Sequence, residues 1–458
     1  MQEHFDTVLR GRVALSGREP ALGQVALAAG RIAALAAPDA HLPAAAEIDC
    51  GNALVLPGAV DVHVHTSSAP EEGIGACTRA AAAGGVTTVV DMPYDHDRMV
   101  ADPEAFAAKA EAVELEAAVD VGLWATVRPQ GPLEHVAELV DAGACAFKLS
   151  TFETHPTRFP RVPDDRLLAA FEAIAAAGGL AGVHSENDEI VRAGIERLRA
   201  AGRREATAHA ESRPAVAETE AIGRSLELAR ASGVRLHICH VTVERGIELA
   251  LRAGSDGVDV SVETCPHYLL LDEDELASRG GEAKINPPLR PAKEVQALWR
   301  RLAAGEIDLV SSDHVGWPAA RKRGDDVFAL AAGAPGVELI VPLMHDAIDT
   351  RGLSIALLTR LLAEGPARRF GLWPRKGSLL PGADADIVVL DPEAEWVVDP
   401  GALVTPAGWS PYSGRRVRGR VRLVLARGQT VFNGERVLAE PGRGRLVRPE
   451  RHREPVHA

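Results

Sequence analysis

Short apolar runs with the character of β-strands alternate with alanine-rich stretches of helical spacing between residues 54 and about 362. Three such runs, at 180–184, 235–240 and 307–311, each follow a helix-like stretch. Parallel strands joined by helical crossovers produce this alternation, and so many repeats indicate closure. We therefore predict an α/β fold built on a (β/α)8 TIM-type barrel. An open, doubly wound sheet is the structural alternative, because alternation alone does not prove closure.

The two ends of the chain have a different texture. Strand-like runs with turns fill about residues 5–50, and two more runs, at 386–390 and 421–425, follow Gly377. A length of 458 residues fits a barrel with a smaller companion. The predicted division is 1–53 and 373–440 for a small β-sandwich domain, 54–372 for the barrel and 441–458 for a C-terminal tail.

The charge balance limits the class of partner. A net charge of −14 disfavours a general nucleic-acid binder, since such proteins neutralise phosphates with clustered lysines and arginines. The arginine-rich segment 442–453 is the local exception, and we expect it to be solvated or to contact another subunit. No apolar run reaches the eighteen or so residues of a membrane span, so none is predicted.

The cysteines and the first residues indicate the compartment. The five cysteines are odd in number and far apart, which argues against a disulfide framework and a Cys-x-x-Cys zinc site. Residues 1–6 carry acids and lack the basic and apolar regions of a secretory signal. We therefore expect a cytoplasmic protein.

The sharpest motif is the segment Asp61-Val62-His63-Val64-His65. Side chains alternate between the two faces of a strand, so His63 and His65 point to one side. At the carboxyl end of a barrel strand, that side is the mouth where reactions take place. A pair of ordinary core or surface histidines is an equal alternative for this motif taken alone.

Polar residues end four further apolar runs: Lys148, His184, His240 and Asp313. Taken singly, each has an ordinary explanation, such as a lysine that reaches the surface, a packed histidine or an aspartate that caps a helix or turn. Strand parity puts His240 on the face opposite to His237, so we interpret His237 as a packed or supporting group.

The strand ends together predict a metal centre at the rim of the barrel. Imidazoles and carboxylates suit zinc and similar ions that keep an open position for water. Two ions roughly 3.5 to 4 Å apart can share a hydroxide and polarise a carbonyl group. A lysine ammonium would repel such ions and must lose its charge to act as a ligand. The candidate side chains are His63, His65, Lys148, His184, His240 and Asp313.

Read in order, these residues resemble the amidohydrolase superfamily, and within it the cyclic amidohydrolases: allantoinase, hydantoinase or dihydropyrimidinase, and dihydroorotase. The resemblance covers nearly the whole chain. It extends over residues 48–49, 56–58, 84–93, 263–269, 286–290, 376–378 and 381–386.

The resemblance implies a metal-dependent hydrolase that opens a hydantoin-, ureide- or dihydropyrimidine-like ring by attack of a hydroxide that bridges two metals. It also implies that Lys148 is N6-carboxylated and bridges two divalent ions, with zinc as the first candidate. Asp313 would carry a proton from the water to the leaving amide nitrogen. The implied ligands are His63, His65 and Asp313 for one ion, and His184 and His240 for the other.

Further expectations follow from the same resemblance. Asn286 lies in a segment similar to the family's substrate-contacting loop, so it is our candidate for positioning the ring amide. A turn residue before two prolines is the equal alternative. The resemblance also favours a small-molecule substrate and a homo-oligomer, commonly a tetramer.

Two departures bear on the choice within the family. Dihydroorotase-like enzymes usually place an arginine after the His-x-His pair, where this chain has Thr66. Hydantoinase-like enzymes usually have a tyrosine shortly after the bridging lysine, and residues 149–153 contain none. The segments 264–269 and 286–290 look most like allantoinase, which is therefore the favoured interpretation, although the segment after Lys148 does not match its usual pattern.

Two alternatives stay open beside a hydantoinase- or allantoinase-like enzyme. One is a dihydroorotase-like enzyme, and the other is a catalytically silent, dihydropyrimidinase-like scaffold protein. Silent relatives typically lose metal ligands, whereas all six positions here keep competent residue types. His267 and His314 are expected near the rim, and no role is assigned to the remaining histidines, which are expected on surfaces or helix faces: His96, His135, His155, His209 and His345.

Overall fold

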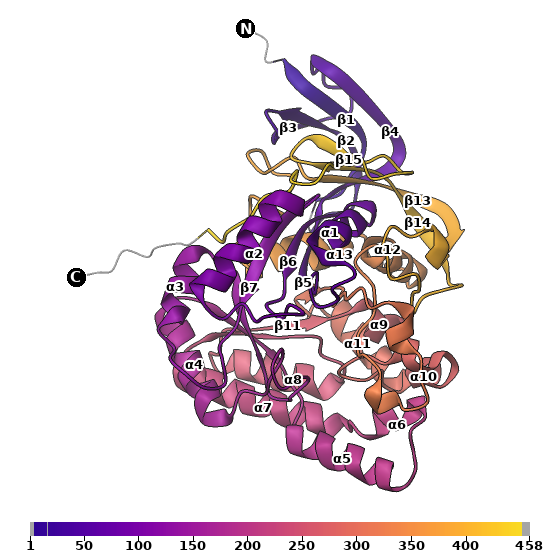
Figure 1. Cartoon of the computed structure of the whole chain (residues 1–458). Helices are drawn as coiled ribbons and strands as arrows, with labels where there is room; N and C mark the ends of the chain where they lie inside the picture. The colour runs from indigo at the N-terminus through magenta and orange to yellow at the C-terminus, as the bar shows by residue number, and fades with distance from the viewer. Residues whose placement is uncertain (1–3, 16, 451–458) are drawn as a thin grey trace, which may run out of the picture.

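A computed structural model describes residues 4–15 and 17–450 of the chain. Its larger sheet has eight strands in the order β12-β11-β10-β9-β8-β7-β6-β5, and every neighbouring pair is parallel (Figure 1). The predicted barrel architecture is therefore confirmed. The strands are β5 Ala59–Val64, β6 Val86–Asp91, β7 Asp120–Ala125, β8 Ala146–Ser150, β9 Leu180–His184, β10 Arg235–Ile238, β11 Val260–Thr264 and β12 Leu309–Val310.

The first and last barrel strands meet just beyond their ends. Val64 of β5 forms a parallel bridge with His314, and the His65 amide donates to the His314 carbonyl at 2.8 Å. This link brings the end of the sheet back to its beginning and excludes the open sheet as the architecture.

Helices follow most of the barrel strands and cover the outside of the sheet (Figure 1). Side-chain caps begin three of them: Asp102 accepts from the Ala105 amide before α2, Asn187 from the Ile190 amide before α5, and Asp272 from the Asp274 amide before α10. The helices are α1 Gly73–Ala83, α2 Pro103–Glu116, α3 His135–Ala142, α4 Asp164–Ala176, α5 Asp188–Ala200, α6 Ala206–Glu211, α7 Ala215–Ser232, α8 Glu244–Ser255, α9 Pro266–Leu270, α10 Glu273–Arg279, α11 Ala292–Ala303, α12 Ile340–Thr350, α13 Ala356–Thr359 and α14 Gly365–Arg369.

The barrel interior is filled by large side chains below the polar strand ends. Trp124 is fully buried, donates to the Val62 carbonyl at 2.8 Å and contacts Phe370 edge-on. Gly182 makes room for this indole, since a Cβ at that position would lie 2.5 Å from the ring of Trp124. The interior is thus a packed core rather than a pore.

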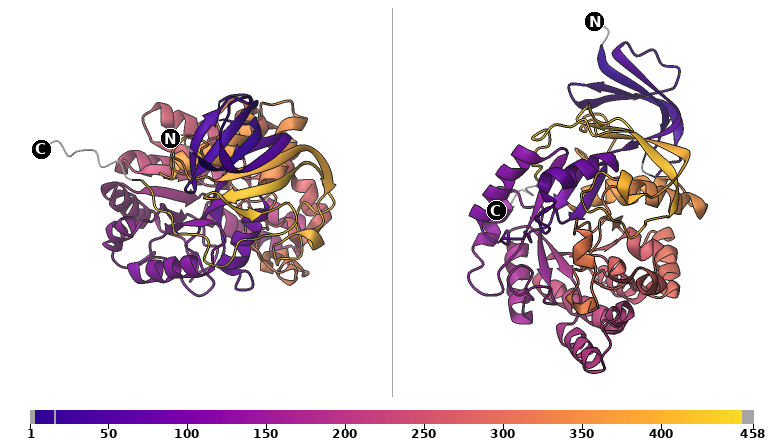
Figure 2. Two further views of the ribbon diagram at one scale, coloured as in Figure 1. Left: turned by 90° about the horizontal axis from the view of Figure 1, so that it is seen from above. Right: turned by 45° about the vertical axis from the view of Figure 1, so that its right-hand side comes forward.

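Both ends of the chain contribute to one separate seven-stranded sheet, with the order β15-β14-β13-β4-β1-β2-β3. Figure 2 shows this sheet set apart from the barrel, with indigo and yellow strands together. The predicted β unit built from both ends is therefore confirmed, while the proposed domain boundaries stay a prediction. The strands are β1 Phe5–Val13, β2 Ala21–Ala28, β3 Arg31–Ala36, β4 Ala44–Pro57, β13 Ile387–Val397, β14 Arg416–Ala426 and β15 Gln429–Phe432.

A buried charge cluster ties the terminal segments to the beginning of β7. The ammonium of Lys376 is fully buried and lies 2.9 Å from carboxylate oxygens of both Asp384 and Asp386. It also contacts Asp120, the first residue of β7. Because an unpaired buried ammonium is costly, this arrangement fixes the segment that precedes β13 on the barrel.

The segment 442–450 packs on the barrel, whereas residues 442–453 were expected to be solvated or to contact another subunit. Leu446 forms a parallel bridge with Val121 of β7, and the Arg445 amide donates to Asp120 at 3.0 Å. Val447 is buried, and burial of this apolar side chain explains why the arginine-rich segment packs on the barrel. The rest of the expected tail, from residue 451 onward, lies outside the described residues. Within the described part of the chain, no helix combines the length and the apolar character needed to cross a membrane.

Candidate active site

One cavity of about 100 Å³ lies at the carboxyl ends of the barrel strands. All seven candidate residues from the sequence line it, although they are spread over more than two hundred positions of the chain. The ends of β5, β8 and β9 and the segments after β10 and β12 carry six of them, as the strand pattern predicted. These residues are His63, His65, Lys148, His184, His240, Asn286 and Asp313.

His63, His65 and Asp313 form one cluster in this cavity. The Nε2 atoms of His63 and His65 lie 3.2 and 3.4 Å from Oδ1 of Asp313. Their possible ligand atoms all lie within 4.8 Å of one another. This nitrogen and oxygen set has the spacing and chemistry to hold one divalent ion.

His184 and His240 form a second pair on the same cavity. Nδ1 of His184 lies 3.1 Å from Nε2 of His240. The other nitrogen of His184, Nε2, donates to Glu186 at 2.8 Å, and Glu186 also pairs with Arg213. Burial alone would raise the pKa of Glu186, but Arg213 and His184 hold it at about 2. The Glu186 carboxylate therefore stays charged. Its hydrogen bond to Nε2 fixes the His184 ring so that Nδ1 points away from Glu186.

Lys148 lies between the two histidine groups. Its side chain is 1% exposed, and Nζ lies 3.3 Å from Nε2 of His63. Among residues 4–15 and 17–450 it makes no ion pair with a carboxylate. An ammonium in this place would be buried beside imidazoles without a directly paired carboxylate, which is a costly arrangement. A carboxylated amine would remove that cost.

Two of the candidate residues have an unusual backbone. His240 has φ of 40° and Asp313 has φ of 46°, in the left-handed region that residues other than glycine rarely adopt. The carboxylate of Asp61 holds the second of these segments, since it accepts from the Ser312 amide at 3.1 Å. Such strain, maintained by surrounding contacts, is typical of functional sites.

Glu263, in β11, supports three of the histidines and was not singled out from the sequence. Its Oε1 accepts from Nδ1 of His63 at 2.8 Å and from the His240 amide at 3.0 Å. Its Oε2 lies 3.0 Å from Nε2 of His237, which points away from the cavity as strand parity predicted. Burial and the charge of an unmodified Lys148 lower the pKa of His63 to about 4.

A phenol also lines the cavity, although none follows Lys148 in sequence. Tyr94, which comes just after β6, donates to the Lys148 carbonyl at 3.0 Å and lies 3.3 Å from the Thr126 hydroxyl. The signal available in the sequence was its place directly after the segment 84–93, where β6 ends. The tyrosine is thus supplied by a different strand from the one that carries the lysine.

The other histidines take varied positions. His314 is buried and lies 2.9 Å from Glu72, and its Nδ1 accepts from the Gly336 amide at 3.0 Å. His209 is buried on α6, with Nε2 2.8 Å from the Ile285 carbonyl beside Asn286. His155 lines the cavity, which differs from the expected surface position, because the chain turns back over the rim there.

Comparison with known proteins places this constellation in a family. The model of the amidohydrolase family matches residues 54–431, which is most of the chain. The chain belongs to the amidohydrolase family. Membership confirms the resemblance that the strand-end residues and the surrounding motifs indicated.

Similar proteins of this family match along almost their whole length. An allantoinase of Rubrobacter xylanophilus is 40% identical over 453 residues, covering 98% of this chain and 99% of the relative. An L-hydantoinase of Paenarthrobacter aurescens is 33% identical over 97% of this chain and 98% of its own. The solved structure of L-hydantoinase (dihydropyrimidinase) from Arthrobacter aurescens superimposes with a TM-score of 0.94 at 34% identity, covering 97% of this chain and all of that one.

Proposed function

We propose that the cavity hydrolyses an amide bond of a five- or six-membered cyclic amide, a hydantoin- or ureide-like ring, to an N-carbamoyl or comparable open acid. The enzyme class rests on the family and on relatives named allantoinase and hydantoinase: the chain is a cyclic amidohydrolase. The observation that carries the assignment of the site is the convergence of four imidazoles, Lys148 and Asp313 on one cavity.

Two divalent ions fit this donor set. His63, His65 and Asp313 would hold one, His184 and His240 the other, and Lys148 would bridge them once carboxylated. Zinc is the first candidate because imidazole and carboxylate ligands suit it. When bound, such ions supply Lewis acidity and lower the pKa of water.

Unsatisfied polar atoms support this fit. Nδ1 of His240 is buried without a hydrogen-bond partner among the described residues, and the buried Nζ of Lys148 contacts His63 there but makes no ion pair with a carboxylate. A buried polar atom without a partner costs free energy unless something else satisfies it. The protein groups alone therefore leave the site incomplete.

Asp313 is our candidate for the proton transfers. Its Oδ1 lies beside His63 and His65 at the cavity wall, where it can accept a proton from the attacking water. When the C–N bond breaks, Asp313 would return that proton to the leaving amide nitrogen. The reaction therefore consumes one water molecule for each ring that it opens.

Asn286 is our candidate for holding the ring amide. It lines the cavity, and its buried Oδ1 has no hydrogen-bond partner among the described residues. An acceptor in this state can take a hydrogen bond from a ring N–H. A cis peptide bond joins Asn286 to Pro287.

The dihydroorotase-like alternative lacks the arginine that such enzymes usually place directly after the histidine pair. Thr66 is fully buried, and its hydroxyl donates to Asp91 at 2.6 Å. It does not line the cavity, so it cannot bind a substrate carboxylate.

The deciding experiment joins metal analysis to a substrate panel. Protein grown with zinc is expected to contain two metal ions per chain and to hydrolyse at least one of hydantoin, allantoin, dihydrouracil and dihydroorotate. A metal-free protein that hydrolyses none of them would contradict the proposal and favour the silent scaffold.

A cytoplasmic homotetramer is proposed from the resemblance alone, and sedimentation of the full chain tests the oligomeric state.

A further inference from the structure

A tight turn carries charge to the rim of the cavity. His155 and Phe159 form an antiparallel bridge, and Nδ1 of His155 accepts from the amides of Thr157 and Arg158 at 3.3 Å each. Phe159 stacks on Tyr94 with ring centroids 3.9 Å apart. The turn is therefore held both by its own hydrogen bonds and by an aromatic contact at the cavity wall.

Arg158 is the cation that this turn presents. It lines the cavity and is partly buried, and its Nη1 donates to the Ser68 carbonyl at 3.2 Å. The hydroxyl of Ser68 in turn lies 3.3 Å from Nδ1 of His65. The guanidinium is thus held close to the segment that carries the histidine pair.

No carboxylate pairs with Arg158 among the residues that the structure describes. Asp313 is the one acid among the described residues that line the cavity, and it faces His63 and His65 instead. The donors of Arg158 that do not bind Ser68 are therefore available to an anion.

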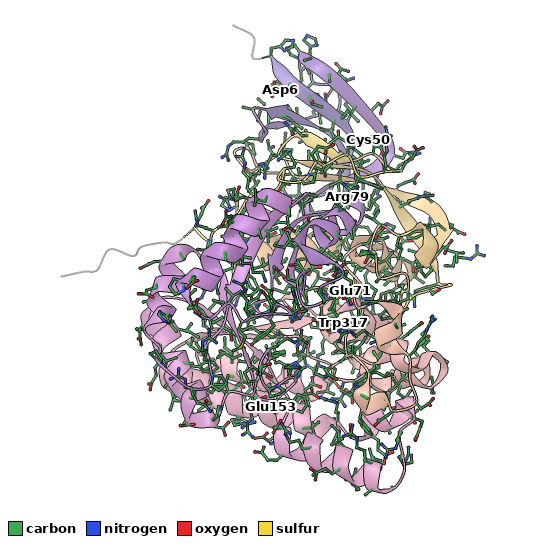
Figure 3. The ribbon with its side chains drawn as sticks, viewed as in Figure 1. Asp6, Cys50, Glu71, Arg79, Glu153 and Trp317 are labelled. Carbon is green, nitrogen blue, oxygen red and sulfur yellow. The ribbon has the colours of Figure 1, made fainter. Side chains whose placement is uncertain are left out.

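A second arginine strengthens the positive charge at the rim. The guanidinium carbons of Arg158 and Arg321 lie 6.0 and 5.1 Å from the ring of Trp317, which also lines the cavity. Trp317 is labelled near the middle of Figure 3, far from Asp6 and Cys50 of the terminal sheet. Burial and the charge of Arg321 lower the pKa of Arg158. An anion bound to Arg158 would offset the repulsion that it experiences from Arg321.

We propose that Arg158 binds a carboxylate of the substrate, so that the preferred substrates are cyclic amides with an acidic side chain on the ring. The inference rests on the proposed function and narrows it. The planar fork of a guanidinium matches a carboxylate in two parallel hydrogen bonds, and Arg321 at the rim adds charge that attracts the anion. The arginine that binds the substrate carboxylate would thus lie in the turn after β8. It would not lie directly after the histidine pair, where this chain has Thr66.

The test compares three hydantoins that differ in one substituent: hydantoin-5-acetate, its neutral acetamide and allantoin, with each enantiomer assayed separately. The expected result is a kcat/KM at least about tenfold higher for the acid than for the amide, mainly because the acid has the lower KM. The variant Arg158→Gln is expected to lower this acid-to-amide ratio by about 10- to 100-fold. Arg252→Gln, an exposed arginine on α8, is the matched control and should keep the ratio of the wild type.

The outcomes separate the two proposals. Hydrolysis of allantoin or the amide as fast as the acid would overturn the role of Arg158 and leave the proposed function intact. Hydrolysis of no ring at all would overturn the proposed function itself. If Arg158→Gln does not fold, the wild type still decides, because KM for the acid should rise several-fold with added salt while KM for the amide stays constant. An acid KM that does not respond to salt would also count against the inference.

Discussion

Glu263 accepts a hydrogen bond from Nδ1 of His63 at 2.8 Å, which leaves Nε2 of that imidazole directed at Asp313. A carboxylate behind a ligating histidine fixes its tautomer and raises its basicity. The same carboxylate holds the His240 amide, so one side chain orients both proposed metal positions.

Replacing Glu263 with glutamine is therefore expected to weaken metal binding by about 10- to 100-fold. The amide preserves the shape but loses the charge that faces His63 and His237. Chelator competition followed by metal analysis measures the change. Wild-type affinity in a folded variant would show that Glu263 serves packing alone.

Lys148 gives a prediction that depends on its covalent state. Protein prepared in ¹³C-bicarbonate is expected to show a carbamate resonance that disappears in Lys148→Arg, because a guanidinium keeps its charge and does not form that adduct. The variant should also lose most of its bound metal. A resonance that survives the substitution would place the carbamate on another lysine.

Glu338 makes stability depend on pH. Burial raises its pKa from 4.5 to about 7, although the amides of Val404 and Thr405 donate to it. The folded state therefore binds more protons between pH 4.5 and 7, and the free energy of unfolding falls as pH rises through that window. The fall attributable to this group is at most about 3 kcal/mol.

Glu338→Gln resembles the protonated acid and should remove this fall. Urea unfolding at pH 5 and pH 8 is expected to show that the variant gains stability relative to the wild type at the higher pH only. A difference between the two proteins that is the same at both pH values would contradict the assignment.

The Lys376 cluster gives a prediction about the junction between the terminal sheet and the barrel. Lys376→Met removes the cation that Asp120, Asp384 and Asp386 share. Arg427 still contacts Asp120 and Arg31 still pairs with Asp384, so Asp386 loses the most. Loss of one partner from such a group typically costs about 3–5 kcal/mol. Thermal unfolding should show a large decrease in Tm, whereas Lys293→Met at an exposed position of α11 should change it little.

The sequence predicted those features that repeat with a fixed period. Runs that end in His184 and His240 indicated strands, and strand parity directed His237 away from the cavity. A barrel brings the ends of parallel strands to one rim, so residues far apart in the chain could be placed together.

Features that depend on the path of loops could not be predicted in this way. Tyr94 and His155 reach the cavity because the segments after β6 and β8 turn over its rim. Glu263 supports the histidines through the register of neighbouring strands. The left-handed backbone of Asp313 is imposed by surrounding contacts, since aspartate has only a weak preference for that conformation.

The bridge between Val64 and His314 has a consequence for biosynthesis. His65 and Asp313, which flank this bridge, become neighbours only after more than three hundred residues have been made and the eighth strand has docked beside the first. A nascent or truncated chain that ends before β12 lacks the last member of the cluster. From the proposed role of Asp313, we expect hydrolytic activity only once the barrel is complete, so a polypeptide that ends before β12 is expected to leave the substrate unchanged.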